Sequence, residues 1–468
     1  MGQISTVKVF SGTNQPSQNG INSLGGTISY DPALPTSKYY LDVDASGRKY
    51  GYRGGNYTTG IAVNSGDLPG TDAEMSFKYF YNHAPSFISD IFAKINSCHF
   101  ALLQPYNNGF SLLKLIAVYN NESARQPSLV PLALIAQNVR SYQPPLDVAS
   151  SSTNTHALNV ILSWKIILND YMIAKTKFFI QQRAENSTSL TNSFYYNPRY
   201  YGYATYEGYP VGTNLEPWAA YSSANHSYDP IALFGSEAAG TQAYNYIDDI
   251  QSVGCLPSMT VFAPYNAIEL GEMVDYSQDH SAEYWYGSSP VPNIDGYNNA
   301  WNEHDARNYN YIYLQDNINL INGTLHIYPV VKYNIVPTDC NEVPRYYYNR
   351  GHVNNTYYFW EPSFGLSYTP INNVNLYFSM VKTKKVPNIS VPYSIVRGSP
   401  TPASITVQPE SDISFDANVL YISNVVSGNL SVFRRNLNNI FSQYYDQPQV
   451  KLMSAITAVP CIRGLPLV

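Results

Sequence analysis

The alternation of apolar and polar residues is most regular over residues 157–180. One face of its first half is entirely apolar and carries Leu158, Val160, Leu162, Trp164, Ile166 and Leu168. The alternation resumes after Asn169 and Asp170, where Lys175 and Lys177 mark the polar face. A period of two residues predicts two antiparallel strands that are joined by a tight turn.

Each of these two predicted strands is about a dozen residues long, whereas strands of globular proteins most often have about five or six. A strand that crosses a bilayer at a tilt needs about nine to eleven residues. A face of large apolar side chains opposite a face with lysines is typical of a barrel wall, with lipid outside and water inside. A long strand of a water-soluble sandwich is the alternative interpretation.

Three further segments repeat the pattern. Residues 309–333 alternate on both sides of Asn322-Gly323, the dipeptide that most strongly predicts a short hairpin turn. Two more predicted hairpins turn within residues 370–373 and near Ser427-Gly428. The longest intervening stretches are rich in Tyr, Asn, Gly and Pro and are expected to be loops: residues 183–252 and 264–308. Short turns that alternate with long loops predict an all-β, antiparallel outer-membrane β-barrel.

Composition is consistent with such a barrel and excludes one class of partner. The chain has 44 Tyr against 18 Phe and 5 Trp, and only 13% of its residues are charged. Tyr has high β-propensity and suits surfaces that are partly wet. The formal net charge of -6 argues against a nucleic-acid partner, which would require a basic surface.

No motif in the sequence predicts an enzyme, a cofactor or a metal site. Nucleophile elbows, phosphate-binding loops and dinucleotide-binding turns are missing. The four cysteines lack metal-ligand spacing, so both disulfides and free thiols remain open. The metal-capable residues of 280–283 and 303–305 fall in predicted polar loops and are interpreted as solvated loop residues. Asp248-Asp249 is interpreted as loop or lumen surface.

Aromatic residues of the predicted loops are the candidate ligand-binding residues. They could stack on a flat ligand or a sugar, although an interfacial girdle or loop packing is the favoured interpretation for any single Tyr. The candidates are Tyr200, Tyr203, Tyr284, Trp285 and Tyr346.

Four segments, in order along the chain, resemble the TonB-dependent outer-membrane receptors. They are GINSLGGTISY at 20–30, YLQD at 313–316 with YPVVKY at 328–333, WEPSFGLSY at 360–368, and FRRNLNNIF at 433–441. The resemblance implies that residues 1–30 are the C-terminal remnant of a plug domain and that residues 31–445 are a partial barrel. Residues 446–468 are then a tail of unclear structure, because prolines interrupt the alternation there.

The resemblance also implies a function. Members of this family are receptors in the Gram-negative outer membrane that take up a scarce nutrient, such as a ferric siderophore or similar chelate, with energy delivered by the TonB protein. The expected partners are therefore outer-membrane lipid, a ferric chelate and, in full-length members, TonB.

The sequence departs from the family pattern in several respects. The family has a signal peptide, a TonB box, a long plug and a barrel of about 22 strands. The sequence shows no leader, no TonB box and only the last strand of the plug. We therefore expect a fragment with an incomplete barrel that does not transport. The alternative is a secreted β-rich carbohydrate-binding or adhesive surface protein, with which several Asn-x-Ser/Thr sequons are compatible.

Overall fold

The structure is a computed structural model. It describes residues 4–11, 26–50, 54–86, 88, 90–126, 149–192, 205–206, 209–210, 241–286, 299–342, 352–387, 408–423, 426–446, 451–457 and 462–464. Within these residues, no helix reaches the length and hydropathy that a membrane span requires.

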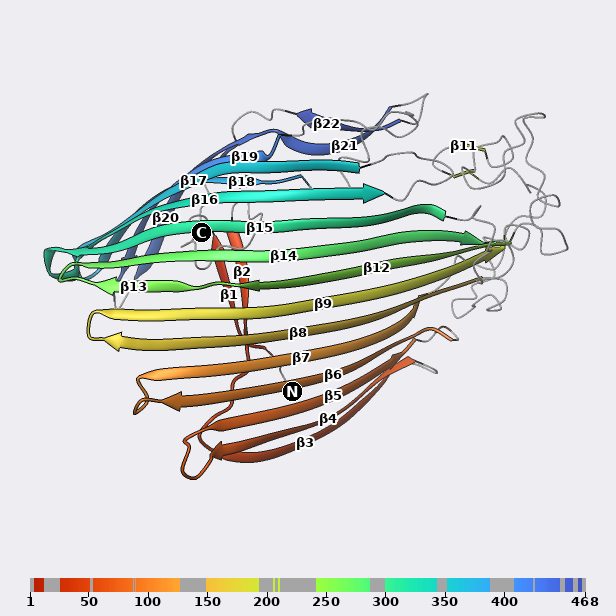
Figure 1. The fold of residues 1–468 in the computed structure, drawn as a ribbon, viewed down its shortest axis with the longest axis horizontal. Coiled ribbons are helices and arrows are strands. Elements are labelled where there is room, and N and C mark those ends of the chain that lie inside the picture. Colours follow the sequence, from red (N-terminus) through yellow and green to blue (C-terminus); the bar gives the residue numbers. More distant parts are fainter. Residues whose placement is uncertain are drawn as a thin grey trace.

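Long antiparallel strands make up most of the described chain (Figure 1). The strands of the main sheet are β3 Tyr39–Tyr50, β4 Gly54–Asp67, β5 Glu74–Pro85, β6 Phe92–Tyr106, β7 Ser111–Gln126, β8 Ala149–Asn169, β9 Met172–Asn192, β12 Thr241–Cys255, β13 Ser258–Phe262, β14 Asn266–Tyr286, β15 Asn299–Leu320, β16 Leu325–Glu342, β17 His352–Ile371, β18 Val374–Lys385, β19 Glu410–Ile422, β20 Ser427–Asn438 and β23 Ile462–Gly464. Three small hairpins lie outside this sheet: β1 Ile4–Ser11 with β2 Gly26–Pro32, β10 Thr205–Tyr206 with β11 Tyr209–Pro210, and β21 Ile440–Asp446 with β22 Lys451–Thr457.

Strands that follow one another in the chain pair as neighbours, and the main sheet closes into a barrel. β12 and β13 lie in line, because both pair with β9 on one side and with β14 on the other. The antiparallel β-barrel that the alternation predicts is therefore confirmed.

Closure depends on one short strand. β23 lies between β20 and β3, and three residue pairs, from Phe433↔Gly464 to Arg435↔Ile462, join it to β20. β20 itself has 12 residues, so most of this edge has no strand partner among the described residues. We refer to this join between β20 and β3 as the seam. The unpaired edges that we expect of an incomplete barrel are thus confined to the seam.

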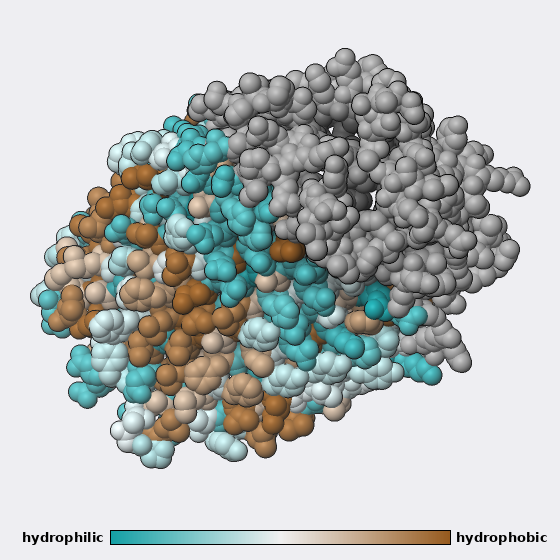
Figure 2. Space-filling model, turned by 45° about the vertical axis from the view of Figure 1, so that its right-hand side comes forward, coloured by the Kyte–Doolittle hydropathy of each residue, from teal (hydrophilic) through white to brown (hydrophobic). Residues whose placement is uncertain are grey.

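Apolar side chains face outward around the barrel, and charged side chains face inward. Leu162 and Phe178 are 36% and 49% exposed, whereas Glu361 and Asp412 are 8% and 0% exposed. Apolar residues form patches on the outer surface in Figure 2. This arrangement is the reverse of a water-soluble protein and fits a wall with lipid outside and a polar lumen.

Strand register places these faces consistently from one strand to the next. Leu162 pairs with Leu115 of β7 and with Phe178 of β9, so these three outward side chains form one apolar row. The next residue, Ser163, pairs with Lys114 and with Lys177, which point into the lumen. Such rows continue around the barrel and form an apolar belt that is exposed on the outside.

The hairpin of residues 157–180 is confirmed, with its turn one residue later than predicted. Asn169 pairs with Met172, so Asp170 and Tyr171 are the turn residues. The Asn169 side chain still stabilises the turn, because its Oδ1 accepts a hydrogen bond from the Tyr171 backbone N–H at 2.9 Å.

Large parts of the predicted loops are strand, and this prediction is wrong for them. Segments of the two predicted loops, residues 183–252 and 264–308, belong to four long strands. These strands are β9, β12, β14 and β15, with 21, 15, 21 and 22 residues. β14 crosses the belt, where Ile268, Leu270 and Val274 are exposed on its outer face. Beyond the belt the strands continue where neither face meets lipid and both faces are polar. Without an apolar face the period of two is lost, and a Tyr- and Asn-rich strand looks like a loop.

The turn at Asn322-Gly323 is longer than the two-residue turn that this dipeptide favours. Leu320 pairs with Leu325, and the loop between them includes a 3-10 turn over Ile321–Gly323. Ile321, Asn322 and Gly323 have φ of +53°, +54° and +81°. Asn and Gly adopt this left-handed conformation readily, but for a β-branched residue such as Ile it is strained.

We therefore expect Ile321→Asn to stabilise the barrel by about 1 kcal/mol. Denaturant unfolding of the protein in lipid vesicles measures the difference. Ile371→Asn is the matched control, because Ile371 is similarly exposed, at 61% against 62%, and ends β17 beside a turn, with no positive φ of its own. Equal effects of the two substitutions would show that the strain at Ile321 is not the cause.

The terminal hairpin β1–β2 pairs only within itself among the described residues, and in Figure 1 it runs across the direction of the barrel strands. An ion pair of 2.6 Å between Lys8 Nζ and Asp31 Oδ2 links its two strands. The division into residues 1–30, 31–445 and 446–468 stays a prediction.

Candidate functional site

The inner wall of the barrel carries most of the buried charge of the described residues. Lys332, Glu361, Glu269, Asp275 and Asp412 are all buried there. A buried charge is costly unless it is paired or hydrogen-bonded, so each of these groups needs partners on the wall. The lumen is therefore the place to look for binding chemistry.

Glu269 of β14 is the centre of one polar cluster. Tyr313 Oη donates a 2.7 Å hydrogen bond to Glu269 Oε1, and Gln315 Nε2 donates one of 3.3 Å to Oε2. Lys175 Nζ lies 3.9 Å from Oε2. Gly271 faces Tyr313, and a Cβ at Gly271 would overlap the tyrosine ring. The small residue thus lets Tyr313 lie flat along the wall and reach Glu269.

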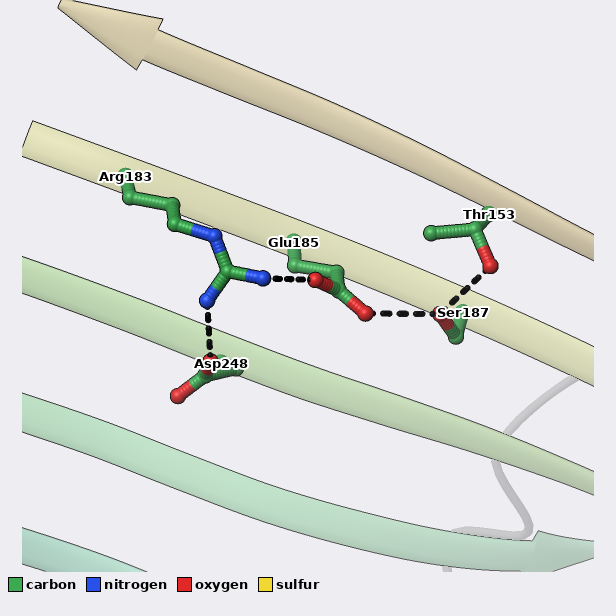
Figure 3. Close-up of polar contacts among 5 residues, drawn as sticks. All are labelled: Thr153, Arg183, Glu185, Ser187 and Asp248. Carbon is green, nitrogen blue, oxygen red and sulfur yellow. Dashed lines mark hydrogen bonds and ion pairs between the residues drawn. The ribbon is translucent and has the colours of Figure 1, made fainter. Parts of the chain in front are cut away.

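A second cluster ties β8, β9 and β12 together (Figure 3). Arg183 Nη1 donates to Asp248 Oδ2 at 2.8 Å, and Arg183 also pairs with Glu185. Ser187 Oγ donates to Glu185 Oε1 at 3.2 Å, and Thr153 Oγ1 lies 2.9 Å from Ser187 Oγ. The chain of contacts links three strands beyond the apolar belt.

The opposite wall holds one buried ion pair and one pair in which only the carboxylate is fully buried. Lys332 Nζ lies 2.6 Å from Glu361 Oε2, and the backbone N–H of Lys384 donates to Glu361 Oε1 at 2.7 Å. Arg435 Nε donates to Asp412 Oδ2 at 3.0 Å. Each pair bridges neighbouring strands, so these charges fix the strand register of the wall.

The described residues contain no group of three or more His, Cys, Asp or Glu side chains that could hold a metal ion. The cysteines that the structure describes, Cys98, Cys255 and Cys340, are not joined in disulfides. The polar lumen therefore offers ammonium, guanidinium, carboxylate and hydroxyl groups for binding.

A family model described as "TonB dependent receptor-like, beta-barrel" matches residues 6–454, which is nearly the whole chain. The chain belongs to the TonB-dependent receptor family. Receptors of this family are Gram-negative outer-membrane proteins, which agrees with the apolar belt and the polar lumen. No curated protein matches the chain in sequence.

Solved structures of TonB-dependent receptors have the same fold at low sequence identity. The ferric citrate transporter FecA in its unliganded form is 12% identical, with a TM-score of 0.65 over 95% of this chain and 57% of FecA. FpvA of P. aeruginosa bound to heterologous pyoverdines is 14% identical, with a TM-score of 0.64 over 96% of this chain and 56% of FpvA. The siderophore receptor PiuA from Acinetobacter baumannii is 11% identical, with a TM-score of 0.63 over 97% of this chain and 64% of PiuA. The chain thus spans less than two thirds of the length of each of these receptors.

The aromatic candidates from the sequence are not assembled into a described site. Tyr200, Tyr203 and Tyr346 lie outside the described residues. Tyr284 and Trp285 were predicted in a loop, but they lie at the end of β14, where their backbones pair with Asn299 of β15 and Tyr244 of β12. The loop assignment of these two residues is therefore wrong, because the strand continues beyond the belt.

The metal-capable residues of 280–283 and 303–305 are also strand residues rather than loop residues. His280 of β14 pairs with His304 of β15, and their rings stack with centroids 4.2 Å apart. Asp248 and Asp249 likewise lie in β12. The register between neighbouring strands brings these residues together, and neither segment alone predicts that register.

The inward-facing lysines of β7, β8 and β9 are the site residues that the sequence did not single out. Lys175 and Lys177 mark the polar face of a predicted strand, and that alternation was the available signal. Their meeting with Lys114 and Lys165 depends on strand pairing, which the sequence pattern leaves open.

Proposed function

We propose that this chain forms the membrane wall of an outer-membrane receptor for a scarce nutrient, such as a ferric siderophore or a similar chelate. The observation that carries the proposal is an apolar outer belt around a charged lumen in a chain of the TonB-dependent receptor family. The structural relatives include a ferric citrate transporter, a receptor bound to pyoverdines and a siderophore receptor, which supports an iron chelate as ligand.

In this proposal the receptor whose wall this chain forms binds and passes its ligand without covalent chemistry. Ligand would enter from the end with the long connections, such as residues 193–240 between β9 and β12, and would move along the polar lumen. Energy would come from TonB across the periplasm, as in the rest of the family. These 468 residues by themselves are expected not to transport, because among the described residues only three residue pairs join β20 to β23 at the seam. Unpaired strand edges in lipid are very unfavourable.

Expression in a Gram-negative host that lacks its own iron receptors tests the proposal. We expect the protein in the outer-membrane fraction, with a folded form that migrates differently before and after heating. Cells or vesicles should bind at least one labelled ferric chelate of a panel of citrate, catecholate and hydroxamate complexes, without accumulating it.

Three outcomes of this experiment would contradict parts of the proposal. Accumulation of the chelate would overturn the expectation that the chain does not transport. Binding of no chelate in the panel would contradict the ligand class. A monodisperse product that needs no detergent would favour the alternative, a secreted carbohydrate-binding or adhesive protein.

A further inference from the structure

Four lysines converge on one region of the lumen from three adjacent strands. Lys165 of β8 and Lys175 of β9 are direct cross-strand partners. Lys114 of β7 and Lys177 of β9 both pair with Ser163 of β8, which lies between them. Two neighbouring rows of the inner wall therefore each present two ammonium groups.

These lysines line a recess of about 420 Å³, together with Glu269 and Tyr313. Glu269 is the single carboxylate of this lining, and it already accepts the hydrogen bond from Tyr313. Lys175 lies 3.9 Å from Glu269, whereas Lys165 and Lys177 form no ion pair among the residues that the structure describes. The recess thus has an excess of positive charge.

The arrangement is unfavourable for the empty barrel. Like charges on directly opposed residues of an antiparallel pair destabilise the sheet, and Lys165 and Lys175 are such a pair. On the opposite wall, the buried Lys332 and the partly buried Arg435 each have their own carboxylate. A bound anion would supply in the recess the negative charge that this part of the wall lacks.

We propose that the recess binds a small anion with two or more carboxylates, either free or as the ligand of a metal chelate. Its volume lies in the range of about 300–1,000 Å³ that is usual for small-molecule sites. Ser163 and Ser258 add hydroxyl donors to the ammonium groups, and Leu112 and Leu256 close the recess with apolar surface. The inference rests on the proposed function, because the ligand must enter the lumen to reach this wall.

The inference is tested by calorimetry on the full chain in detergent micelles. Citrate is titrated into one sample and ferric citrate into a parallel sample. Each of Lys165→Gln and Lys177→Gln is expected to weaken citrate binding about tenfold, as for the loss of one charged hydrogen bond. Lys382→Gln on β18 removes a lysine from the outer face, away from the recess; it is the control for the change of charge and should bind citrate as the wild type does. Glucose, which is neutral, should not bind to the recess.

The outcomes answer two questions: whether the recess is the binding site, and whether it takes the free anion or the metal chelate. Equal binding of citrate and ferric citrate assigns the recess to the carboxylates alone, whereas preference for ferric citrate assigns it to the chelate. No citrate binding by the wild type, or equal loss in Lys382→Gln and the two recess variants, would overturn the inference. Because these titrations do not require uptake or TonB, they can fail or succeed independently of the cellular experiment.

Discussion

Leu162→Arg is expected to destabilise the folded barrel in lipid vesicles by about 2–4 kcal/mol, the cost of a cation on the lipid face near the middle of a bilayer. Leu162 lies near the centre of the apolar face of β8 and packs in the row with Leu115 and Phe178. Denaturant unfolding of wild type and variant in vesicles measures the difference, with heat-dependent migration as the check that both proteins fold.

Asn159→Arg is the control for this substitution, because Asn159 lies on the same strand and faces the lumen. Its partners Val118 and Gln181 are also on the inner face. A cation in the water-filled lumen should change the free energy of unfolding by less than about 1 kcal/mol. If both arginines destabilise the barrel equally, the assignment of the two faces of β8 is wrong.

Glu361→Leu is expected to destabilise the barrel by about 3–5 kcal/mol, because it leaves the buried ammonium of Lys332 without its carboxylate. The two side chains are only 8% and 10% exposed, and their charged atoms lie 2.6 Å apart. Asn334 Nδ2 also loses its acceptor, since it donates to Glu361 Oε2 at 3.0 Å. Unfolding in vesicles again measures the change.

A double variant and a second ion pair make this prediction specific. Lys332→Met combined with Glu361→Leu removes both charges and should recover much of the lost stability. Lys8→Met breaks a pair of the same 2.6 Å length whose side chains are 54% and 40% exposed, and it should cost less than about 1 kcal/mol. A double variant that is as unstable as Glu361→Leu would show that lost hydrogen bonds or packing, and not the unpaired charge, cause the effect.

The barrel could be predicted from the sequence because the apolar belt leaves a local signal. Wherever one face of a strand meets lipid, as from Val160 to Trp164, alternation is visible in a window of a few residues. Beyond the belt both faces are polar, and the same strand continues without that signal. For this reason the ends of β14 and β15, with His280, Tyr284 and His304, were assigned to loops.

Features that depend on distant segments could not be predicted in this way. Closure at the seam depends on residues 462–464 pairing with β20, and nothing in that short segment identifies its partner. The lysine recess depends on the register between β7, β8 and β9, where a shift of one residue would send Lys165 to the lipid face. Local alternation therefore predicts the wall, and only the paired strands reveal the lysine recess inside it.

Spin labels placed one at a time along β8, at residues 158–166, give the most direct test of the wall geometry. Collision with oxygen dissolved in the bilayer and with a water-soluble nickel chelate is measured at each position in vesicles. Labels at Val160 and Leu162 should respond to oxygen, and labels at Ser163 and Lys165 should respond to the nickel chelate, in strict alternation. Labels that show no alternation, or that are shielded from both reagents as in a compact water-soluble sandwich, would contradict the membrane barrel.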